Sequence, residues 1–321
     1  MNPPLYKNEP IGSIQSLAAM LRIPTEALFK LAKDADDYYS PNKPQPKPNG
    51  GVRVTYTVKP LLKKVQLRIV QQIFHNVDYP LYLQGSIRDE KNPRDYINNA
   101  SLHAGKRIII REDIRNFFPS IKTPTVLRMW QYFFHFPEDV AMILTQLTTY
   151  KGCVPQGAST SSYISNLIFW DKEPQLEDQL QRQGFQYSRF VDDITISSDK
   201  FMSKQEQESL TAKVYGMLHT IEVRPNRSKR KVQTRTKKMT VHELNINSGR
   251  PTLSKQNRAK IRAAVKECED LARFDRSSEE YKHLYQSVNG RVAVMSRLHP
   301  NEAKKYRERL QEIRPIPQQA G

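Results

Sequence analysis

Three aspartates stand at the ends of short apolar stretches, where carboxylates can do metal-dependent chemistry. Asp113 follows the compact run Ile108–Ile110, and Asp192 and Asp193 separate two further apolar stretches. Neighbouring carboxylates repel one another unless a cation neutralises them. Mg²⁺ binds one or two carboxylates together with substrate phosphates and retained waters, and a pair of such ions can activate a hydroxyl and stabilise a leaving pyrophosphate. Taken alone, the Asp192-Asp193 pair is explained about as well by a solvated β-turn.

The elements that would position these aspartates are β-strands. Arg107–Glu112, with three consecutive isoleucines, is typical of a buried strand, and Tyr187–Phe190 and Ile194–Ser197 predict a hairpin with a polar apex. If both elements pair in one sheet, the three carboxylates converge. Elsewhere, Val52–Thr57 predicts a strand, and Thr25 is a candidate helix cap after the interruption at Pro24. Apolar spacing predicts helices over 14–31, 61–74 (with Leu61 on the buried face), 125–134, 140–149, 255–272 and 279–297.

Four ordered motifs around the aspartates resemble those of reverse transcriptases. Phe190-Val191-Asp192-Asp193 is similar to their aromatic-x-Asp-Asp signature, Asp113–Ser120 to their earlier aspartate motif, and Val154–Ser159 to the intervening Pro-Gln-Gly motif. Asn98-Asn99-Ala100-Ser101-Leu102-His103 resembles the Asn-Ala-x-x-His element of bacterial retron reverse transcriptases. The resemblance covers roughly Val52 to Ile246. It implies an α+β right-hand polymerase with fingers, palm and thumb that extends a primer with deoxynucleotides on an RNA template.

The resemblance also implies roles for individual residues. Asp113 and Asp192 would bind two Mg²⁺ ions with help from the Ile114 carbonyl, and Asp193 would complete the acidic cluster. Phe118 matches the bulky residue that collides with a ribose 2′ hydroxyl, with core packing as its alternative; on an extended backbone, neighbouring Phe117 would point the opposite way. Gln156 would line the nucleotide pocket, and Gly157 would permit close backbone approach.

Two cations are candidates for the triphosphate. Arg53 follows Gly50-Gly51 on the expected strand, and a guanidinium can pair bidentately with phosphate oxygens; the alternative is a solvated surface arginine. Asn226 and Lys229 stand where the family often has an asparagine and a downstream lysine, so Lys229 would protonate or neutralise pyrophosphate. For His103, a hydrogen-bonded structural imidazole is preferred over a reactive one.

The chain departs from the family pattern in two places. Ser159 and Ser162 stand where the family usually has prolines, which loosens the backbone restriction of that loop. Val241-His242-Glu243 stands where retron enzymes carry Val-Thr-Gly.

The charge indicates a polyanionic partner. The chain has 51 Lys and Arg against 33 Asp and Glu, a net charge of +18. Between Arg224 and Arg262 there are 13 basic residues against the single acid Glu243. We expect this basic block to line the duplex side of a thumb and to neutralise phosphates, although a solubilising face is the alternative. The RNA-binding candidates are Arg227, Lys231, Lys238, Lys255, Arg258 and Arg262.

Cysteine usage and hydropathy bear on the compartment. Cys153 and Cys268 are the only cysteines and form no CxxC motif, so neither a disulfide scaffold nor a zinc site is expected. The first residues lack a signal-peptide pattern, and the uncharged stretch 152–170 is rich in Ser, Thr, Gln and Asn. We therefore expect a reducing, cytoplasmic compartment and no membrane partner.

We expect three parts in the chain. Residues 1–50 form a helical segment and a Pro-rich linker, residues 51–247 the fingers and palm, and residues 248–321 a basic helical thumb that binds RNA. The resemblance to retron enzymes implies a cognate non-coding RNA as primer and template, deoxynucleoside triphosphates, an RNA-linked single-stranded DNA product (msDNA), and an effector protein in antiphage defence. The alternatives are an abortive-infection-type polymerase with untemplated or other-template synthesis, and a non-catalytic RNA-binding scaffold.

Overall fold

A central sheet, the palm, carries all three aspartates. A computed structural model of the chain describes residues 2–46 and 51–316. The composition of Asn49-Gly50-Gly51 predicts a hairpin turn, and its first two residues lie outside these ranges. Neighbouring strands are antiparallel except β7, which runs parallel to β9. The predicted strand and hairpin therefore lie side by side, as expected. The strand order is β11 (Lys231–Thr234), β8 (Ile108–Asp113), β10 (Asp193–Ser198), β9 (Gln186–Phe190) and β7 (Leu83–Gln84).

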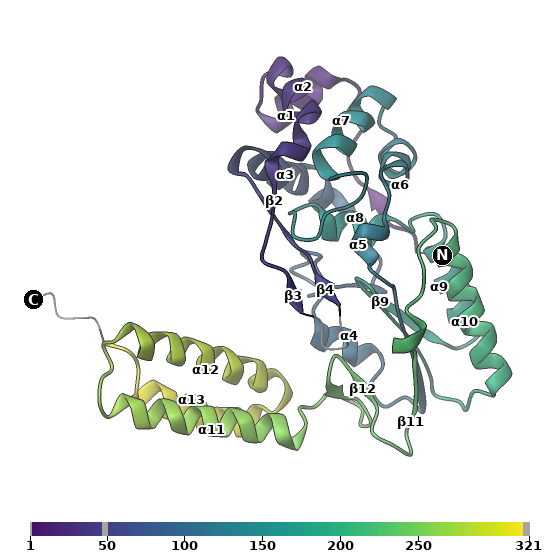
Figure 1. Cartoon of the computed structure of the whole chain (residues 1–321). Coiled ribbons are helices and arrows are strands. Elements are labelled where there is room, and N and C mark those ends of the chain that lie inside the picture. Colours follow the sequence, from purple (N-terminus) through teal and green to yellow (C-terminus); the bar gives the residue numbers. More distant parts are fainter. Residues whose placement is uncertain (1, 47–50, 317–321) are drawn as a thin grey trace, which may run out of the picture.

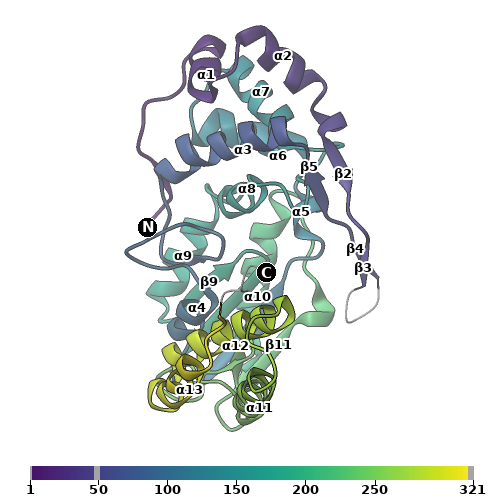
Figure 2. The same ribbon diagram turned by 90° about the vertical axis from the view of Figure 1, so that its left-hand side faces the viewer.

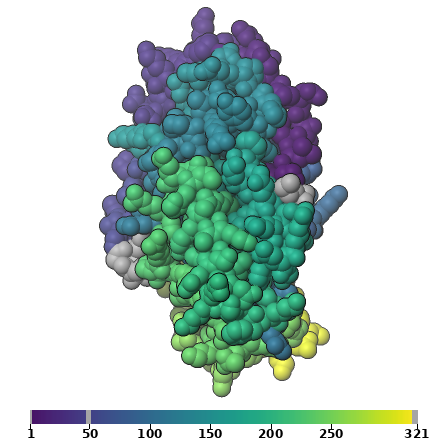
Figure 3. Space-filling model, turned by 90° about the vertical axis from the view of Figure 1, so that its right-hand side faces the viewer, coloured from purple at the N-terminus to yellow at the C-terminus, as the bar shows by residue number. Residues whose placement is uncertain are grey.

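Both faces of β8 are buried, which explains its run of isoleucines. Successive side chains of a strand point to opposite faces. Ile108 and Ile110 join the main apolar core, whereas Ile109 joins a smaller core with the hairpin of β12 (Thr240–Val241) and β13 (Leu244–Asn245). On the main-core side the sheet is backed by α9 (Glu173–Arg182) and α10 (Lys204–His219), seen at the right of Figure 1 and on the face shown in Figure 3.

The fingers form the upper lobe in Figure 1. Their core includes a cluster of aromatic rings around the fully buried Trp130, which contacts Phe74, Phe134 and Phe136. The helix predicted over 125–134 is divided into α6 and a π-helical turn at Met129–Phe133. The lobe contains α1 (Ile14–Leu21), α2 (Thr25–Lys33), α3 (Pro60–Gln72), α6 (Thr123–Arg128) and α7 (Glu138–Thr148).

Two local predictions in the fingers are wrong. Leu61 is 48% exposed, because α3 begins at Pro60 and turns Leu62, Val65 and Ile69 inward instead. Thr25 is the first residue of α2 and makes no capping hydrogen bond, since Pro24 occupies the cap position.

A two-stranded ribbon extends from the fingers alongside the palm, as Figure 2 shows. It pairs β2 (Tyr39–Pro41) with β5 (Tyr56–Val58), and β3 (Gln45–Pro46) with β4 (Val52–Arg53). The single strand predicted over Val52–Thr57 is thus two short strands. The ribbon carries Arg53 away from the finger helices and towards the palm.

The thumb is a three-helix bundle with an apolar core of its own. Its helices are α11 (Lys255–Ala272), α12 (Glu279–Leu298) and α13 (Pro300–Glu312). Two begin at serine caps: Ser254 accepts from the Asn257 amide, and Ser278 from the Tyr281 amide. The first two helices were predicted nearly to the residue, and α13 was not predicted. The core of the bundle includes Val265, Cys268, Val288, Val292, Met295 and Leu310.

Short elements connect these three parts. They are β1 (Leu5–Tyr6), β6 (Val77–Asp78), α4 (Tyr96–Leu102), α5 (Phe117–Ser120), α8 (Ser161–Leu167) and the 3₁₀ turns Ala35–Tyr38, Phe74–Asn76 and Arg227–Lys229. No helix within the described ranges is long and apolar enough to cross a membrane.

Candidate active site

The three predicted aspartates meet at one edge of the palm sheet. Asp193 lies opposite Phe190 in the β9–β10 hairpin and opposite Asp113 in the β8–β10 pair. Val191 and Asp192 are therefore the two residues of the hairpin turn. The Ile114 amide donates to the Asp192 carbonyl at 3.0 Å and ties this turn to the end of β8. The convergence expected from the sequence is what the strand register produces.

The turn adopts a strained conformation. Val191 has φ +56°, in the left-handed region, and a β-branched side chain there costs about 1–3 kcal/mol. The surrounding structure must supply that free energy. The Val191 amide donates to the Gln84 carbonyl at 3.3 Å, and the Arg189 guanidinium donates to the Val191 carbonyl at 3.0 Å.

Arg189 is the buried anchor of the turn. It is fully buried and forms a two-pronged ion pair with Glu173, with both N–O distances 2.7 Å. It also donates to the carbonyls of Ser165 and Asn166. A buried charge is tolerated only when it is paired and hydrogen-bonded. Arg189 meets this condition, and one of its hydrogen bonds holds the Val191-Asp192 turn.

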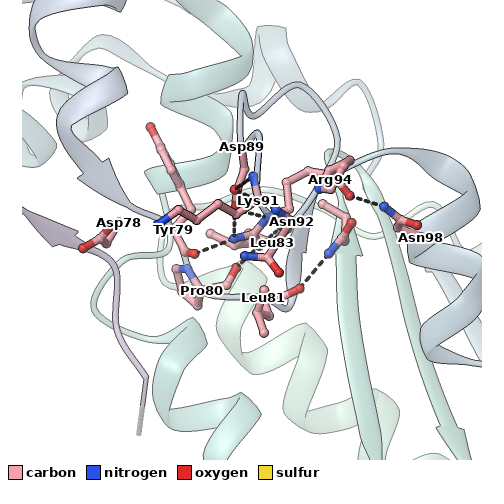
Figure 4. Close-up of polar contacts among 12 residues, drawn as sticks. Asp78, Tyr79, Pro80, Leu81, Leu83, Asp89, Lys91, Asn92, Arg94 and Asn98 are labelled. Atoms are coloured by element: carbon pink, nitrogen blue, oxygen red, sulfur yellow. Dashed lines mark hydrogen bonds and ion pairs between the residues drawn. The ribbon is translucent and has the colours of Figure 1, made fainter.

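A second buried arginine holds the segment that supports the turn from the other side. In Figure 4, Arg94 lies among the backbone carbonyls that precede and enter β7; it donates to those of Tyr79, Pro80 and Leu83 and to the Asp89 carboxylate. Immediately after β7, Gly85 has φ +82°, and a Cβ there would lie 3.0 Å from the Phe190 ring. The close contact between the Gly85 backbone and the Phe190 ring therefore favours glycine at this position.

His103 is a structural residue, as preferred from the sequence. Its Nδ1 lies 2.7 Å from the Ser197 hydroxyl on β10, and its Nε2 lies 2.7 Å from the Ser188 hydroxyl on β9. Burial lowers the pKa of His103 to about 3. The neutral imidazole therefore bridges the two strands of the catalytic hairpin.

Neighbouring cations and hydrogen-bond donors neutralise the charges of the three aspartates to different extents. Asp113 accepts from Lys229 at 2.7 Å and from the Asn226 amide group at 2.9 Å, whereas Asp193 lies 4.0 Å from Arg111. Burial, together with the nearby Asp193 and Asp113 carboxylates, raises the pKa of Asp192 to about 6. The site therefore retains a concentration of negative charge centred on Asp192.

These groups open into a cavity of about 360 Å³. The β3–β4 ribbon contributes Arg53 to its lining, and the role predicted for Arg53 with the triphosphate stays a prediction. Arg111 lines the wall because it is two residues before Asp113 on β8, and Lys231 lies opposite Arg111 on β11. The lining residues are Arg53, Arg111, Glu112, Asp113, Asp192, Asp193, Lys229 and Lys231.

Among the described residues, Gln156, Gly157 and Phe118 do not line this cavity. The Gln156 carbonyl accepts from the Tyr56 amide at 2.8 Å, and a Cβ on Gly157, which has φ +113°, would lie 2.6 Å from the Tyr56 carbonyl oxygen. The close approach that Gly157 permits is thus to the fingers ribbon. Phe118 is half-buried, but it lies in the helical turn α5, so the extended backbone assumed for it is wrong.

With this geometry in place, comparisons with known proteins identify the family. The model for "Reverse transcriptase (RNA-dependent DNA polymerase)" matches residues 45–260. The chain belongs to the reverse transcriptase family. It is 38% identical to the retron Se72 reverse transcriptase of Salmonella heidelberg, over 98% of this chain and 83% of that protein. It is 29% identical to the Escherichia coli retron Ec48 reverse transcriptase, over 97% of this chain and 78% of that protein.

These matches make the chain a bacterial retron-type reverse transcriptase and an RNA-directed DNA polymerase, and they confirm the predicted right-hand fold. A structure of telomerase from Candida albicans with a fragment of telomeric RNA shares 9% identity at TM-score 0.44, over 88% of this chain and 59% of that one. The fold assignment does not depend on it.

The reverse transcriptase fold implies a requirement for a divalent metal. Within the described ranges, no group of three or more Asp, Glu, His or Cys side chains is arranged to hold a metal ion. Asp113 is engaged by Lys229, and Asp193 is near Arg111. The hard oxygens of Asp113 and Asp192 still suit a divalent cation, which would offset the burial and the carboxylate repulsion that raise the pKa of Asp192. The Lys229 ammonium would have to move, and its side chain is 47% exposed.

The basic block does not belong to the thumb alone. Arg227 and Lys231 lie in the palm, because β11 pairs with β8, and Lys238 precedes β12. Assignment of the whole block to the thumb is therefore wrong. Arg227 lies over the Tyr215 ring at 5.7 Å. On α11, Lys255 and Arg262 are exposed, whereas Arg258 pairs with Glu302 at 2.8 Å.

Sequence reasoning assigned no site role to Arg111, Glu112 or His242 of this reverse transcriptase. Strand alternation could have found Arg111, because it shares a face with Asp113. His242 stands out in the sequence only as part of the Val241-His242-Glu243 departure from the family pattern, which predicts no role in the site. It starts the β12–β13 turn in which His242 and Glu243 both have positive φ, and its ring centroid lies 4.4 Å from that of Phe190. Its Nε2 is 2.8 Å from Nδ2 of Asn99. The Asn98–His103 element, which resembles that of retron enzymes, therefore contacts the Val241-His242-Glu243 triplet, which differs from theirs.

Proposed function

We propose that this reverse transcriptase copies part of a cognate structured non-coding RNA into single-stranded DNA that remains joined to that RNA. The observation that carries the proposal is the similarity to the retron Se72 reverse transcriptase, which spans 98% of the chain and so extends past residue 260 into the thumb. From the resemblance to retron enzymes we further propose a role in antiphage defence with an effector protein.

For catalysis, Asp113 and Asp192 would hold two Mg²⁺ ions with the Ile114 carbonyl, and Asp193 would stay near Arg111. When bound, these ions supply charge for activating the primer hydroxyl and for stabilising the leaving pyrophosphate. The protein's own side chains would orient the nucleotide and neutralise the charge of its phosphates. Arg53 and Lys229 would bind phosphate oxygens; in support, both line the cavity beside the aspartates.

Sugar selection and RNA binding use other surfaces. We assign exclusion of the ribose 2′ hydroxyl to the half-buried Phe118, and positioning of the nucleotide to the loop of Gln156 and Gly157. Phosphate contacts would come from two sets of cations, one beside the catalytic edge of the palm and one on α11. These are Arg227, Lys231 and Lys238, and Lys255, Arg258 and Arg262.

The test is to purify the full chain from cells that carry its native locus and to sequence the bound nucleic acid. We expect one RNA species joined to DNA complementary to part of it. An Asp192→Asn variant should retain the RNA and carry no DNA.

Other results would contradict the proposal in different ways. DNA that matches no bound RNA would favour an untemplated or other-template defence polymerase. RNA without DNA in the unaltered chain, together with failure to extend an annealed primer, would favour a non-catalytic scaffold.

A further inference from the structure

Phe201 is an aromatic side chain left almost bare at the end of the palm farthest from the aspartates. It is 77% exposed in the loop between β10 and α10. With Arg107, Arg235 and two threonines it lines a surface hollow of about 480 Å³. Leaving a large ring in water forgoes the free energy of burying it, so a ligand that covers this ring gains affinity.

The hollow is part of the rigid sheet. Thr234 lies opposite Ile108 at the shared end of β11 and β8, and the Arg235 amide donates to the Arg107 carbonyl at 2.8 Å. The two arginines are therefore held side by side. Ile108 and Asp113 are the two ends of β8, which places the hollow about 17 Å from the catalytic edge at roughly 3.3 Å per strand residue. That is about five base steps at 3.4 Å each.

The charge around the hollow is strongly positive. Arg107 and Arg235 are exposed, and in the described part of the chain neither has a carboxylate within ion-pairing distance. Asp199 is paired with Lys106 at 2.6 Å, which leaves it little capacity to neutralise the arginines. Further exposed cations nearby in the sequence are Lys200, Lys237 and Lys238.

An exposed ring in the same hollow as two guanidinium groups without a carboxylate partner fits single-stranded nucleic acid. Bases stack on aromatic rings, and arginines hold the adjoining phosphates. A protein partner is disfavoured, because the centre of a protein interface is built from several apolar groups. Here the remaining lining is Thr234, Thr236 and the buried Ile108.

We propose that Phe201, Arg107 and Arg235 form a binding site for an unpaired strand of nucleic acid, outside the catalytic cavity. One base stacks on the Phe201 ring, and the two guanidinium groups bind the phosphates on either side. The strand is either unpaired RNA near the template or the DNA product, since both present the same stacking face and phosphates.

The experiment compares Phe201→Ala with a matched control, Phe274→Ala, in the full chain. Phe274 is 85% exposed and follows α11 in the thumb. The catalytic cavity is first saturated with an annealed primer–template duplex. Binding of fluorescein-labelled 12-nucleotide RNA and DNA strands is then measured by anisotropy, and 4-thiouridine or 4-thiothymidine versions are cross-linked and mapped by mass spectrometry.

We expect Phe201→Ala to bind the labelled strand about tenfold more weakly, and Phe274→Ala to bind as the unaltered chain does. Cross-links should map to residues 199–203 or 234–236. Arg107→Gln with Arg235→Gln should flatten the slope of log affinity against log salt by about 1.4, since each lost contact to a single strand contributes about 0.7. Lys63→Gln with Lys64→Gln, on α3, is the matched charge control.

The two labelled strands identify the source of the ligand. Weaker binding of RNA alone assigns the site to the template side, and weaker binding of DNA alone assigns it to the product. Extension of a short annealed primer should be unchanged in Phe201→Ala. The proposal is wrong if Phe201→Ala binds both strands normally, or if the cross-links map elsewhere.

Discussion

The palm and the thumb are stabilised in different ways. Behind the catalytic turn the palm buries polar groups, namely the Arg189–Glu173 ion pair and the His103 bridge. The thumb has an apolar core and keeps its ion pairs at the surface, as in Arg309–Glu269 at 2.6 Å. Buried polar groups must be satisfied in one geometry, so they specify atomic positions. The exposed cations of the thumb, by contrast, can attract a polyanion without being held in one exact position.

The largest effect on activity should come from Asp192→Asn. Loss of this carboxylate removes charge stabilisation in the transition state, and we expect DNA synthesis to fall by at least about 100-fold. The same change relieves a buried repulsion, so thermal denaturation at pH 7 without metal should show a stabilised protein, by about 1–2 kcal/mol after solvent screening. RNA affinity is the control and should not change. Near-normal primer extension would remove Asp192 from the catalytic set.

The ion pairs of the two regions should respond very differently to loss of one partner. Glu173→Gln leaves the Arg189 charge buried and unpaired and should destabilise the protein by about 3–5 kcal/mol. Glu269→Gln in the thumb should cost less than about 1 kcal/mol. Urea denaturation of both variants measures the difference. Equal effects would contradict the contrast between palm and thumb.

Stability should depend on pH through His103. Its folded-state pKa of about 3 lies below the unfolded value near 6.5, so the unfolded chain binds the proton first as pH falls. The contribution of the neutral His103 to the free energy of unfolding is fully present above about pH 6.5. It is lost as the pH falls towards 3, at up to about 1.4 kcal/mol per pH unit. Urea denaturation between pH 7.5 and 5 should show a flatter dependence in His103→Asn. The exposed His283→Asn is the control, and parallel profiles for all three proteins would refute the prediction.

Phe118→Ala should change sugar selection more than it changes stability. The ring is half-buried at the edge of the core. If it excludes the ribose 2′ hydroxyl as proposed, its removal opens space for that hydroxyl. We expect more ribonucleotide relative to deoxynucleotide incorporation in single-nucleotide extension assays. Phe117→Leu, at the buried neighbour, is the control. An unchanged ratio with lowered stability would make Phe118 a core residue.

The smallest effect per residue should come from the thumb surface. Lys255→Gln with Arg262→Gln on α11 should weaken binding of all RNAs alike and lower the salt slope by about 1.4–1.8. The rate of extension at saturating RNA should stay the same. A change in which RNA is bound, at constant salt slope, would show that these side chains read sequence or shape.

Much of the catalytic edge followed from local sequence. The isoleucine run, the apolar stretches around Asp192-Asp193 and the glycine of the Pro-Gln-Gly loop each produce their structure within a few residues, because strand alternation and turn chemistry are local. The predicted helices of the fingers and the first two of the thumb occur for the same reason. Resemblance then assigned the roles of the aspartates.

Only the tertiary structure decided the rest, because it depends on contacts between distant residues. The pairing of β11 with β8 moves part of the basic block into the palm and places Lys231 opposite Arg111. The His242 ring reaches Phe190 across the fold, and a buried ion pair between Glu173 and Arg189 holds the Val191 turn. Burial and proximity shift the pKa of Asp192, and neither can be read from the order of residues along a chain.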